Sequence, residues 1–107
     1  MRVVAGRWRG RRLRSPRTTT VRPTSDRTKE AVFDMLASLG QPEGAEVLDL
    51  FAGSGALGIE ALSRGAASAC LVEREAPLAR ALEANLVRLR QDAGATVRVD
   101  DALGVLE

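Results

Sequence analysis

The sequence predicts an α/β domain built on a parallel sheet, and three observations predict it. From Gln41 onward, short apolar runs alternate with amphipathic stretches, and a glycine-rich turn follows the first run. The chain has 107 residues, which fits one small domain. The order strand, helix, strand, helix, strand implies parallel pairing through right-handed crossovers, which is half of a doubly wound sheet.

The first part of the chain predicts a hairpin, a linker and a helix. Two extended pieces, Val3–Ala5 and Arg11–Leu13, flank a Gly-Arg-Trp-Arg-Gly centre that favours a β-hairpin. Ser15–Pro23 is rich in Ser, Thr, Arg and Pro, which is typical of an extended linker. Apolar residues at helical spacing predict a helix over Arg27–Leu39, and Gly40 can end it.

The second part predicts three strands separated by helices. The strands are expected over Glu46–Leu50, Ala69–Glu73 and Thr96–Val99. One helix is expected over Ala56–Arg64, ended by a glycine. The other begins at Pro77, which suits a first helical position, and carries a leucine stripe toward Gly94.

Composition excludes several classes of function. The chain has no histidine and one cysteine, so a disulfide framework, a zinc site and a His-assisted nucleophile are not expected. We predict no bound metal. No apolar run approaches the roughly 20 residues of a membrane span, and the arginine-rich start lacks the apolar core of a secretory signal. A cytoplasmic, monomeric protein is therefore expected.

Charge is distributed unevenly along the chain. Residues 1–29 carry nine arginines and one lysine against one acid, a net charge of +9, whereas residues 30–107 carry a net charge of −7. A basic arm on an acidic body is typical of a protein that binds a polyanion. Trp8, among the arginines, could stack on a base or on a neighbouring guanidinium. The residues expected to contact RNA are Arg2, Arg7, Trp8, Arg9, Arg11, Arg12 and Arg14.

The turn after the first predicted strand has the chemistry of a cofactor site. Gly53, Gly55 and Gly58 satisfy the G-x-G-x-x-G pattern, which permits two interpretations, a dinucleotide or S-adenosylmethionine. Asp49 at the end of that strand favours the second. A carboxylate about 4 Å from a pyrophosphate would be repelled by about 4 kcal/mol at an effective dielectric of 20, whereas a sulfonium and an ammonium would be attracted.

Acids also follow the other two predicted strands. Glu73 ends the second strand, where a carboxylate can accept the hydroxyl groups of a ribose. Asp101 follows the third strand, where it could accept the amino group of an adenine, while its neighbour Asp100 is expected to face solvent. Each of these acids could instead be a solvated turn or capping residue. Phe51 is expected to pack in the core or to shield the cofactor, and Glu60 to be solvated.

Three segments together resemble a known family. They are Arg2–Leu13, Arg22–Arg27 and the run Asp49–Ser63, which reads Asp-Leu-Phe-Ala-Gly-Ser-Gly-Ala-Leu-Gly-Ile-Glu-Ala-Leu-Ser. The combination resembles the bacterial small-subunit rRNA guanine-N2 methyltransferase D family, over essentially the whole chain. The resemblance implies a Rossmann-like class I fold and transfer of a methyl group from S-adenosylmethionine to the exocyclic N2 of a guanine in 16S rRNA, on the small subunit or a particle in its assembly.

The resemblance also implies residue roles. Asp49, Gly53 and Gly55 would hold the methionine end of the cofactor and Glu73 its ribose. Asp101 and Ala102 would hold the adenine, and Thr24 and Asp26, which precede the first long helix, would pack over the cofactor. Residues 1–22 would form the basic hairpin and linker, and residues 23–107 the methyltransferase domain.

One departure from the family pattern concerns catalysis. The family's tetrapeptide, Asp or Asn followed by Pro-Pro and an aromatic residue, is absent, because all four prolines are isolated. The sequence therefore predicts an incomplete parallel sheet, cut before the catalytic motif, that holds the cofactor edge but is inactive by itself. Two alternatives stay open: an NAD-binding oxidoreductase fragment, and a non-catalytic RNA-binding protein.

Overall fold

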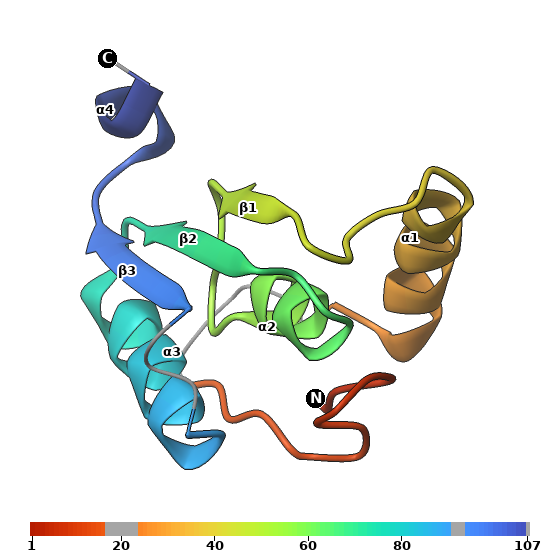
Figure 1. Cartoon of the computed structure of the whole chain (residues 1–107). Helices are drawn as coiled ribbons and strands as arrows, with labels where there is room; N and C mark the ends of the chain where they lie inside the picture. Colours follow the sequence, from red (N-terminus) through yellow and green to blue (C-terminus); the bar gives the residue numbers. More distant parts are fainter. Residues whose placement is uncertain (17–23, 91–93, 107) are drawn as a thin grey trace.

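The computed structural model describes residues 1–16, 24–90 and 94–106 and confirms the parallel α/β architecture (Figure 1). Its three-stranded sheet has the order β1-β2-β3, and both strand pairs are parallel. The predicted strand bounds agree with the observed ones to within one residue. The elements are α1 (Asp26–Ser38), β1 (Glu46–Asp49), α2 (Ala56–Ser63), β2 (Ser68–Glu73), α3 (Ala76–Arg88), β3 (Ala95–Val99) and α4 (Ala102–Leu106).

The two crossover helices lie on the same face of the sheet (Figure 1). α2 packs against β1 and β2, α3 packs against β2 and β3, and α1 packs beside α2. Since the strands are parallel, the turns that follow β1, β2 and β3 all lie at one edge of the sheet. Among the described residues, no helix is long and apolar enough to cross a membrane. Most of the predicted linker, residues 17–23, lies outside the described residues.

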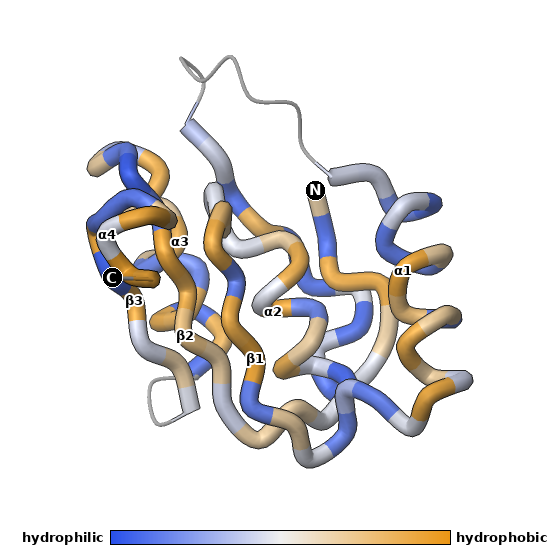
Figure 2. Tube along the Cα trace, turned by 90° about the horizontal axis from the view of Figure 1, so that it is seen from above, coloured by the Kyte–Doolittle hydropathy of each residue, from blue (hydrophilic) through white to orange (hydrophobic). Residues whose placement is uncertain are grey.

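The hydrophobic core lies between the sheet and α2 and α3. Ile59 of α2, Leu82 of α3 and Leu71 of β2 are each 0% exposed. Figure 2 shows apolar residues running along β1 and β2, but only β2 is largely buried, whereas Leu48 of β1 is exposed. α1 contributes Phe33 to the same core, where that side chain is buried.

The predicted hairpin is present, and it is packed against the domain. A single antiparallel bridge pairs Arg2 with Arg12, and the Val3 N–H donates to the Arg11 carbonyl at 2.9 Å. Its apolar residues Val3, Trp8 and Leu13 belong to the core of the domain.

The burial of Trp8 corrects one of our expectations. Its side chain is 8% exposed, and the Arg7 guanidinium lies 4.4 Å from the ring centroid. We considered two stacking partners for this indole, a base and a neighbouring guanidinium. In the structure the indole stacks on the guanidinium of Arg7, and no ring face is left open for a base. The reason is hydrophobic: an indole lying over α2 gains more from burial than from remaining in water.

Glu60 of α2 is also placed differently from our expectation. It is 0% exposed rather than solvated, and it accepts the N–H groups of Val4 at 2.9 Å and Ala5 at 3.0 Å. Arg64 pairs with it at 2.8 Å, and the buried Lys29 ammonium lies 3.7 Å from its Oε1. A fully buried carboxylate is tolerated because these partners satisfy it. Glu60 thereby fixes the hairpin to α1 and α2.

Candidate functional site

The fold brings the three predicted acids to one edge of the sheet. Asp49 is the last residue of β1, Glu73 is the last residue of β2, and Asp101 stands between β3 and α4. β1 and β2 pair in register so that Asp49 is opposite Leu71, two residues before Glu73. The carboxyl edge of a parallel sheet is where ligands bind in open α/β folds.

Asp49 is held away from water. Burial raises the pKa of Asp49 above its ordinary value of 3.8, and the nearby negative charge of Glu73 raises it further. The backbone N–H groups of Phe51 and Gly58 oppose this effect and lower the pKa of Asp49. The Phe51 N–H donates to Asp49 Oδ1 at 3.2 Å. The charged form of this half-buried residue is therefore poorly solvated, and backbone N–H groups stabilise it.

Glu73 holds the glycine turn in place. Its Oε1 accepts the Gly53 N–H at 2.9 Å and its Oε2 accepts the Glu75 N–H at 2.8 Å. The residue is 9% exposed. Each carboxylate oxygen has a second lone pair, so the group can still accept a ligand hydroxyl. The hydrogen bond between Glu73 and Gly53 was not predicted, because it joins the turn after β1 to the end of β2, and these are distant in the sequence.

The three glycines of the pattern serve different purposes. Gly53 has a φ of +57°, and a Cβ added there would meet nothing within 4 Å, so its backbone faces open space. Gly55 is buried, and an added Cβ would lie 2.5 Å from Leu82. At Gly58 an added Cβ would lie 2.0 Å from Leu71. Gly55 is explained by its left-handed φ of +103° and by close packing between α2 and α3, and Gly58 by helix–sheet packing, whereas Gly53 leaves room for a ligand.

Two cavities adjoin at this edge. One, of about 370 Å³, is lined by Gly53, Glu73, Asp101 and Ala102 among others. The other, of about 310 Å³, is lined by Asp49 together with apolar residues of α1 and α2. Both cavities include Phe51, which is 81% exposed and therefore lies over the site rather than in the core. The predicted cofactor residues are thus divided between two neighbouring spaces.

The two acids after β3 accept hydrogen bonds from backbone N–H groups close to them in the sequence. Asp101 Oδ1 accepts the Gly104 N–H at the start of α4, and the Asp101 N–H donates to Asp100 Oδ1 at 2.8 Å. Asp100 was expected to face solvent, but it is only partly exposed and lines the larger cavity with Asp101. Ala102 lines the same cavity, so a flat ring system there would meet backbone and a small side chain.

Thr24 and Asp26 line neither of these two cavities. Asp26 lies in the first turn of α1 and pairs instead with Arg2 of the hairpin at 2.9 Å. The capping residue of this helix is Ser25, whose side chain accepts the Thr28 N–H at 3.1 Å. In this structure, Asp26 therefore connects α1 to the hairpin.

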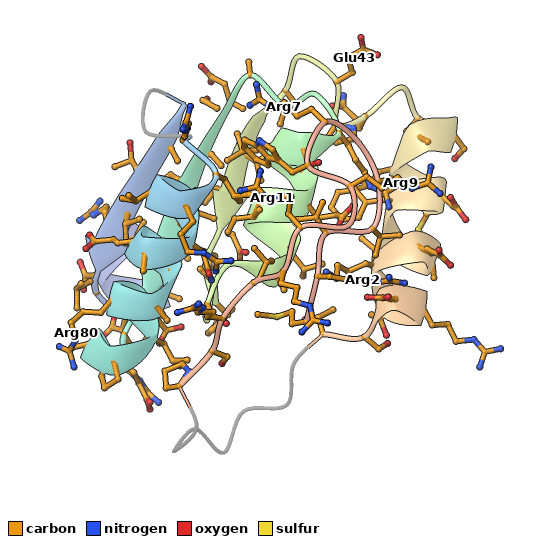
Figure 3. All side chains as sticks on the ribbon, turned by 90° about the horizontal axis from the view of Figure 1, so that it is seen from below. Arg2, Arg7, Arg9, Arg11, Glu43 and Arg80 are labelled. Atoms are coloured by element: carbon orange, nitrogen blue, oxygen red, sulfur yellow. The ribbon has the colours of Figure 1, made fainter. Side chains whose placement is uncertain are left out.

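The hairpin arginines are presented on one face of the molecule. Figure 3 shows Arg2, Arg7, Arg9 and Arg11 on the side where the hairpin crosses α2. Arg11 also donates to the Arg88 carbonyl at the end of α3 at 3.0 Å. The exposed arginines of the hairpin are Arg2, Arg7, Arg9, Arg11, Arg12 and Arg14.

The charge balance at the sheet edge favours a cationic ligand. Within the described residues, none of the ion pairs includes Asp49 or Glu73. Two largely buried carboxylates that are in no ion pair are unfavourable for the protein alone, and a positively charged group bound beside them would offset this cost. The open space at Gly53 and the pair of cavities give such a ligand room. S-adenosylmethionine has this charge, so the residues present fit it.

The fold and this edge of the sheet define a Rossmann-like methyltransferase domain. A structure described as "Putative methyltransferase yhhF from Escherichia coli" matches with a TM-score of 0.86 and 40% identity, over 99% of this chain and 55% of that chain. A structure from Pyrococcus horikoshii, described as a "putative RNA methyltransferase PH1948", matches with a TM-score of 0.75 and 27% identity, over 83% of this chain and 46% of that one.

The chain belongs to the family described as conserved hypothetical protein 95, whose model matches residues 1–107. It is 47% identical over 90 residues to ribosomal RNA small subunit methyltransferase D of Escherichia coli K12, covering 84% of this chain and 44% of that protein. The protein of the same name from Haemophilus influenzae is 43% identical over 90 residues, covering 84% and 46%. The resemblance to the methyltransferase D family is thus confirmed, and the chain spans about half the length of these relatives.

Proposed function

We propose that this chain provides the S-adenosylmethionine site of an enzyme that methylates the exocyclic N2 of a guanine in 16S rRNA. The observation that carries the proposal is the pair of largely buried carboxylates, Asp49 and Glu73, which stand beside the open glycine turn and take part in none of the ion pairs of the described residues. The names of the relatives support rRNA of the small subunit as the substrate class. Such a protein would work in the cytoplasm on the subunit or on particles in its assembly.

The residues of the chain have separate roles in this proposal. Asp49 attracts the positive end of the cofactor, Glu73 accepts the ribose hydroxyls, and Asp101 with Ala102 receives the adenine. When bound, the cofactor supplies a methyl group on a sulfonium. Phe51, exposed over both cavities, covers the bound molecule and excludes water from it.

Methyl transfer to guanine needs groups that this chain does not contain. The N2 lone pair is delocalised into the ring, so N2 is a poor nucleophile. It needs acceptors for its N–H groups and a surface for the extruded base. The Asp/Asn-Pro-Pro-aromatic tetrapeptide that the resemblance implies for this purpose is absent from the sequence. We therefore propose that the 107-residue chain binds the cofactor and transfers no methyl group by itself.

Calorimetric titration tests the ligand assignment directly. We expect the chain to bind S-adenosylmethionine and not NAD, because Asp49 would repel a pyrophosphate. Asp49→Asn keeps the size of the side chain and an acceptor for the Phe51 N–H but removes the charge. It should weaken binding at least tenfold, which corresponds to about 1.4 kcal/mol.

Glu46→Gln is the matched control for Asp49→Asn. Glu46 lies on the same strand, is exposed, and lines neither cavity, so its neutralisation should leave the affinity unchanged. Binding of NAD, or equal effects of the two substitutions, would contradict the cofactor assignment. Methyl transfer to 16S rRNA by the chain alone would contradict the proposed inactivity without affecting that assignment.

A further inference from the structure

Asn85 is a buried polar residue on an otherwise apolar face of α3. Its neighbours on that face, Leu82, Leu86 and Leu89, belong to the hydrophobic core. Asn85 itself is 1% exposed. An amide at a core position is unfavourable unless its groups are bonded, so the partners of this side chain indicate its purpose.

Every hydrogen-bonding group of the Asn85 side chain is used. Its Nδ2 donates to the Arg14 carbonyl at 2.9 Å and to the Ser54 carbonyl at 3.0 Å. Its Oδ1 accepts the Arg14 N–H at 2.9 Å and a longer contact from Arg88 at 3.4 Å. A side-chain amide offers two N–H donors and an oxygen with two lone pairs, so this set is complete.

The two backbone segments that Asn85 joins belong to different parts of the proposed function. Arg14 follows the second strand of the hairpin, which carries the exposed arginines. Ser54 lies between Gly53 and Gly55 in the turn at the cofactor cavities, and the Gly53 N–H is held by Glu73. Figure 3 shows the hairpin running beside α3, the helix that carries Asn85.

Other buried side chains hold the hairpin without reaching this turn. Ser63 accepts the Trp8 N–H at 3.0 Å and donates to the Ala5 carbonyl at 2.7 Å. Glu60 accepts the Val4 and Ala5 N–H groups. The side-chain bonds of Asn85, by contrast, connect the hairpin segment directly to the glycine turn.

We propose that Asn85 is a positioning residue that couples the hairpin to the glycine turn, so that RNA on the hairpin strengthens S-adenosylmethionine binding. The inference rests on the proposed function, which assigns the cofactor to the glycine turn, and on the sequence-based prediction that the hairpin arginines contact the RNA substrate. A bound RNA backbone restrains Arg14, Asn85 transmits that restraint to the Ser54 carbonyl, and the turn is then ordered before the cofactor arrives. The effect is reciprocal: the cofactor must strengthen RNA binding by the same factor.

Calorimetry with S-adenosylmethionine, in the presence and absence of poly(U), tests the coupling. We expect poly(U) to tighten cofactor binding by about fivefold or more in the unaltered chain, the lower end of measured couplings. In Asn85→Ala the two affinities should be equal. Leu86→Val, which removes a buried methylene group from the next position of α3 and leaves the amide in place, should keep the coupling.

Amide hydrogen exchange gives a second readout that does not depend on the cofactor. Poly(U) should slow exchange at Gly53 and Gly55 in the unaltered chain and in Leu86→Val, but not in Asn85→Ala. If Asn85→Ala does not fold, Asn85→Asp replaces it, because it keeps the acceptor for Arg14 and removes both donated bonds. Its coupling should also be lost.

The outcomes separate the inference from the proposed function. Binding of S-adenosylmethionine and poly(U) with no mutual effect, or a coupling that survives in the Asn85 variants, would overturn the inference and leave the proposed function standing. Failure of the unaltered chain to bind S-adenosylmethionine would contradict the proposed function instead. The exchange rates at Gly53 and Gly55 would then test only the connection between the hairpin and the turn, and rates unchanged by poly(U) would overturn that connection.

Discussion

At the scale of single residues, the largely buried Asp49 carboxyl group lowers the stability of the fold at neutral pH. Burial raises the pKa of this carboxyl group, so the folded chain holds the proton more tightly than the unfolded chain does. The free energy of unfolding must therefore fall as the pH rises from the ordinary value of 3.8 through the raised pKa, and it stays reduced above that range. A bound cationic ligand would offset this loss of free energy of unfolding.

Asp49→Asn should consequently affect stability and ligand binding in opposite directions. At pH 7 the amide has no charge to desolvate, so we expect a higher free energy of unfolding together with weak cofactor binding. Between pH 3.8 and neutrality, the decline seen in the unaltered chain should be smaller in the variant. Urea unfolding at several pH values measures both effects, and a variant less stable than the unaltered chain at pH 7 would contradict them.

At the scale of elements, the hairpin is a packed component of the domain, and its glycines differ accordingly. Gly6 and Gly10 both have positive φ, at +88° and +83°. A Cβ on Gly6 would lie 1.9 Å from the Ser63 carbonyl oxygen of α2, whereas a Cβ on Gly10 would meet nothing within 4 Å. Both substitutions incur backbone strain, but only the first must displace the hairpin from α2.

Gly10→Ala should lower the free energy of unfolding by about 1 kcal/mol, the usual cost of a left-handed conformation without glycine. Gly6→Ala should cost about 1–3 kcal/mol more, because backbone atoms cannot move aside as a flexible side chain can. Urea titrations of the two variants give the difference. Equal losses would show that the hairpin is not fixed against Ser63.

The Glu60 network fixes the same hairpin through charge. Glu60→Gln would leave the Lys29 ammonium, which is 0% exposed, without its carboxylate. Removal of one partner from a buried pair typically costs about 3–5 kcal/mol, and we expect a loss in that range. Adding Lys29→Met removes the stranded charge and should recover part of the loss. If the double variant is less stable than Glu60→Gln, the ammonium does not depend on Glu60.

The sequence was most informative where neighbouring residues decide the structure. Each strand is a short apolar run bounded by turn residues, and the acids that end β1 and β2 were placed by position in the run. Burial of Trp8, Glu60 and Asn85 was not predictable in this way. Glu60 binds Val4 across 56 positions, and Asn85 binds Arg14 across 71. These partners become neighbours only after folding, so a local sequence pattern cannot predict the contacts between them.

At the scale of the whole molecule, positive charge is concentrated at the N-terminal end of the chain. Residues 1–29 carry a net charge of +9 and the remainder −7, while the cofactor cavities are lined by acids of the second part. Under the proposed function, this separation would allow the domain to attract a polyanion and a cationic cofactor at different places. The hairpin's packing on α2 and α3 holds its arginines on one face rather than on a free strand.

Salt dependence distinguishes a specific basic face from net charge alone. Arg9→Gln with Arg12→Gln removes two exposed hairpin charges, and Arg27→Gln with Arg98→Gln removes two exposed charges elsewhere, so both double variants have the same net charge. Each lost phosphate contact should reduce the slope of log K against log salt by about 0.7 for single-stranded RNA.

We therefore expect the hairpin variant to lose about 1.4 from that slope and the other variant to lose almost nothing, because only contacts that release counterions contribute. Fluorescence anisotropy with labelled poly(U) between roughly 50 and 200 mM salt covers the range in which this term changes affinity strongly. Equal slopes in the two double variants would mean that RNA responds to the overall charge of the domain, and the hairpin would lose its assignment as the RNA-binding face.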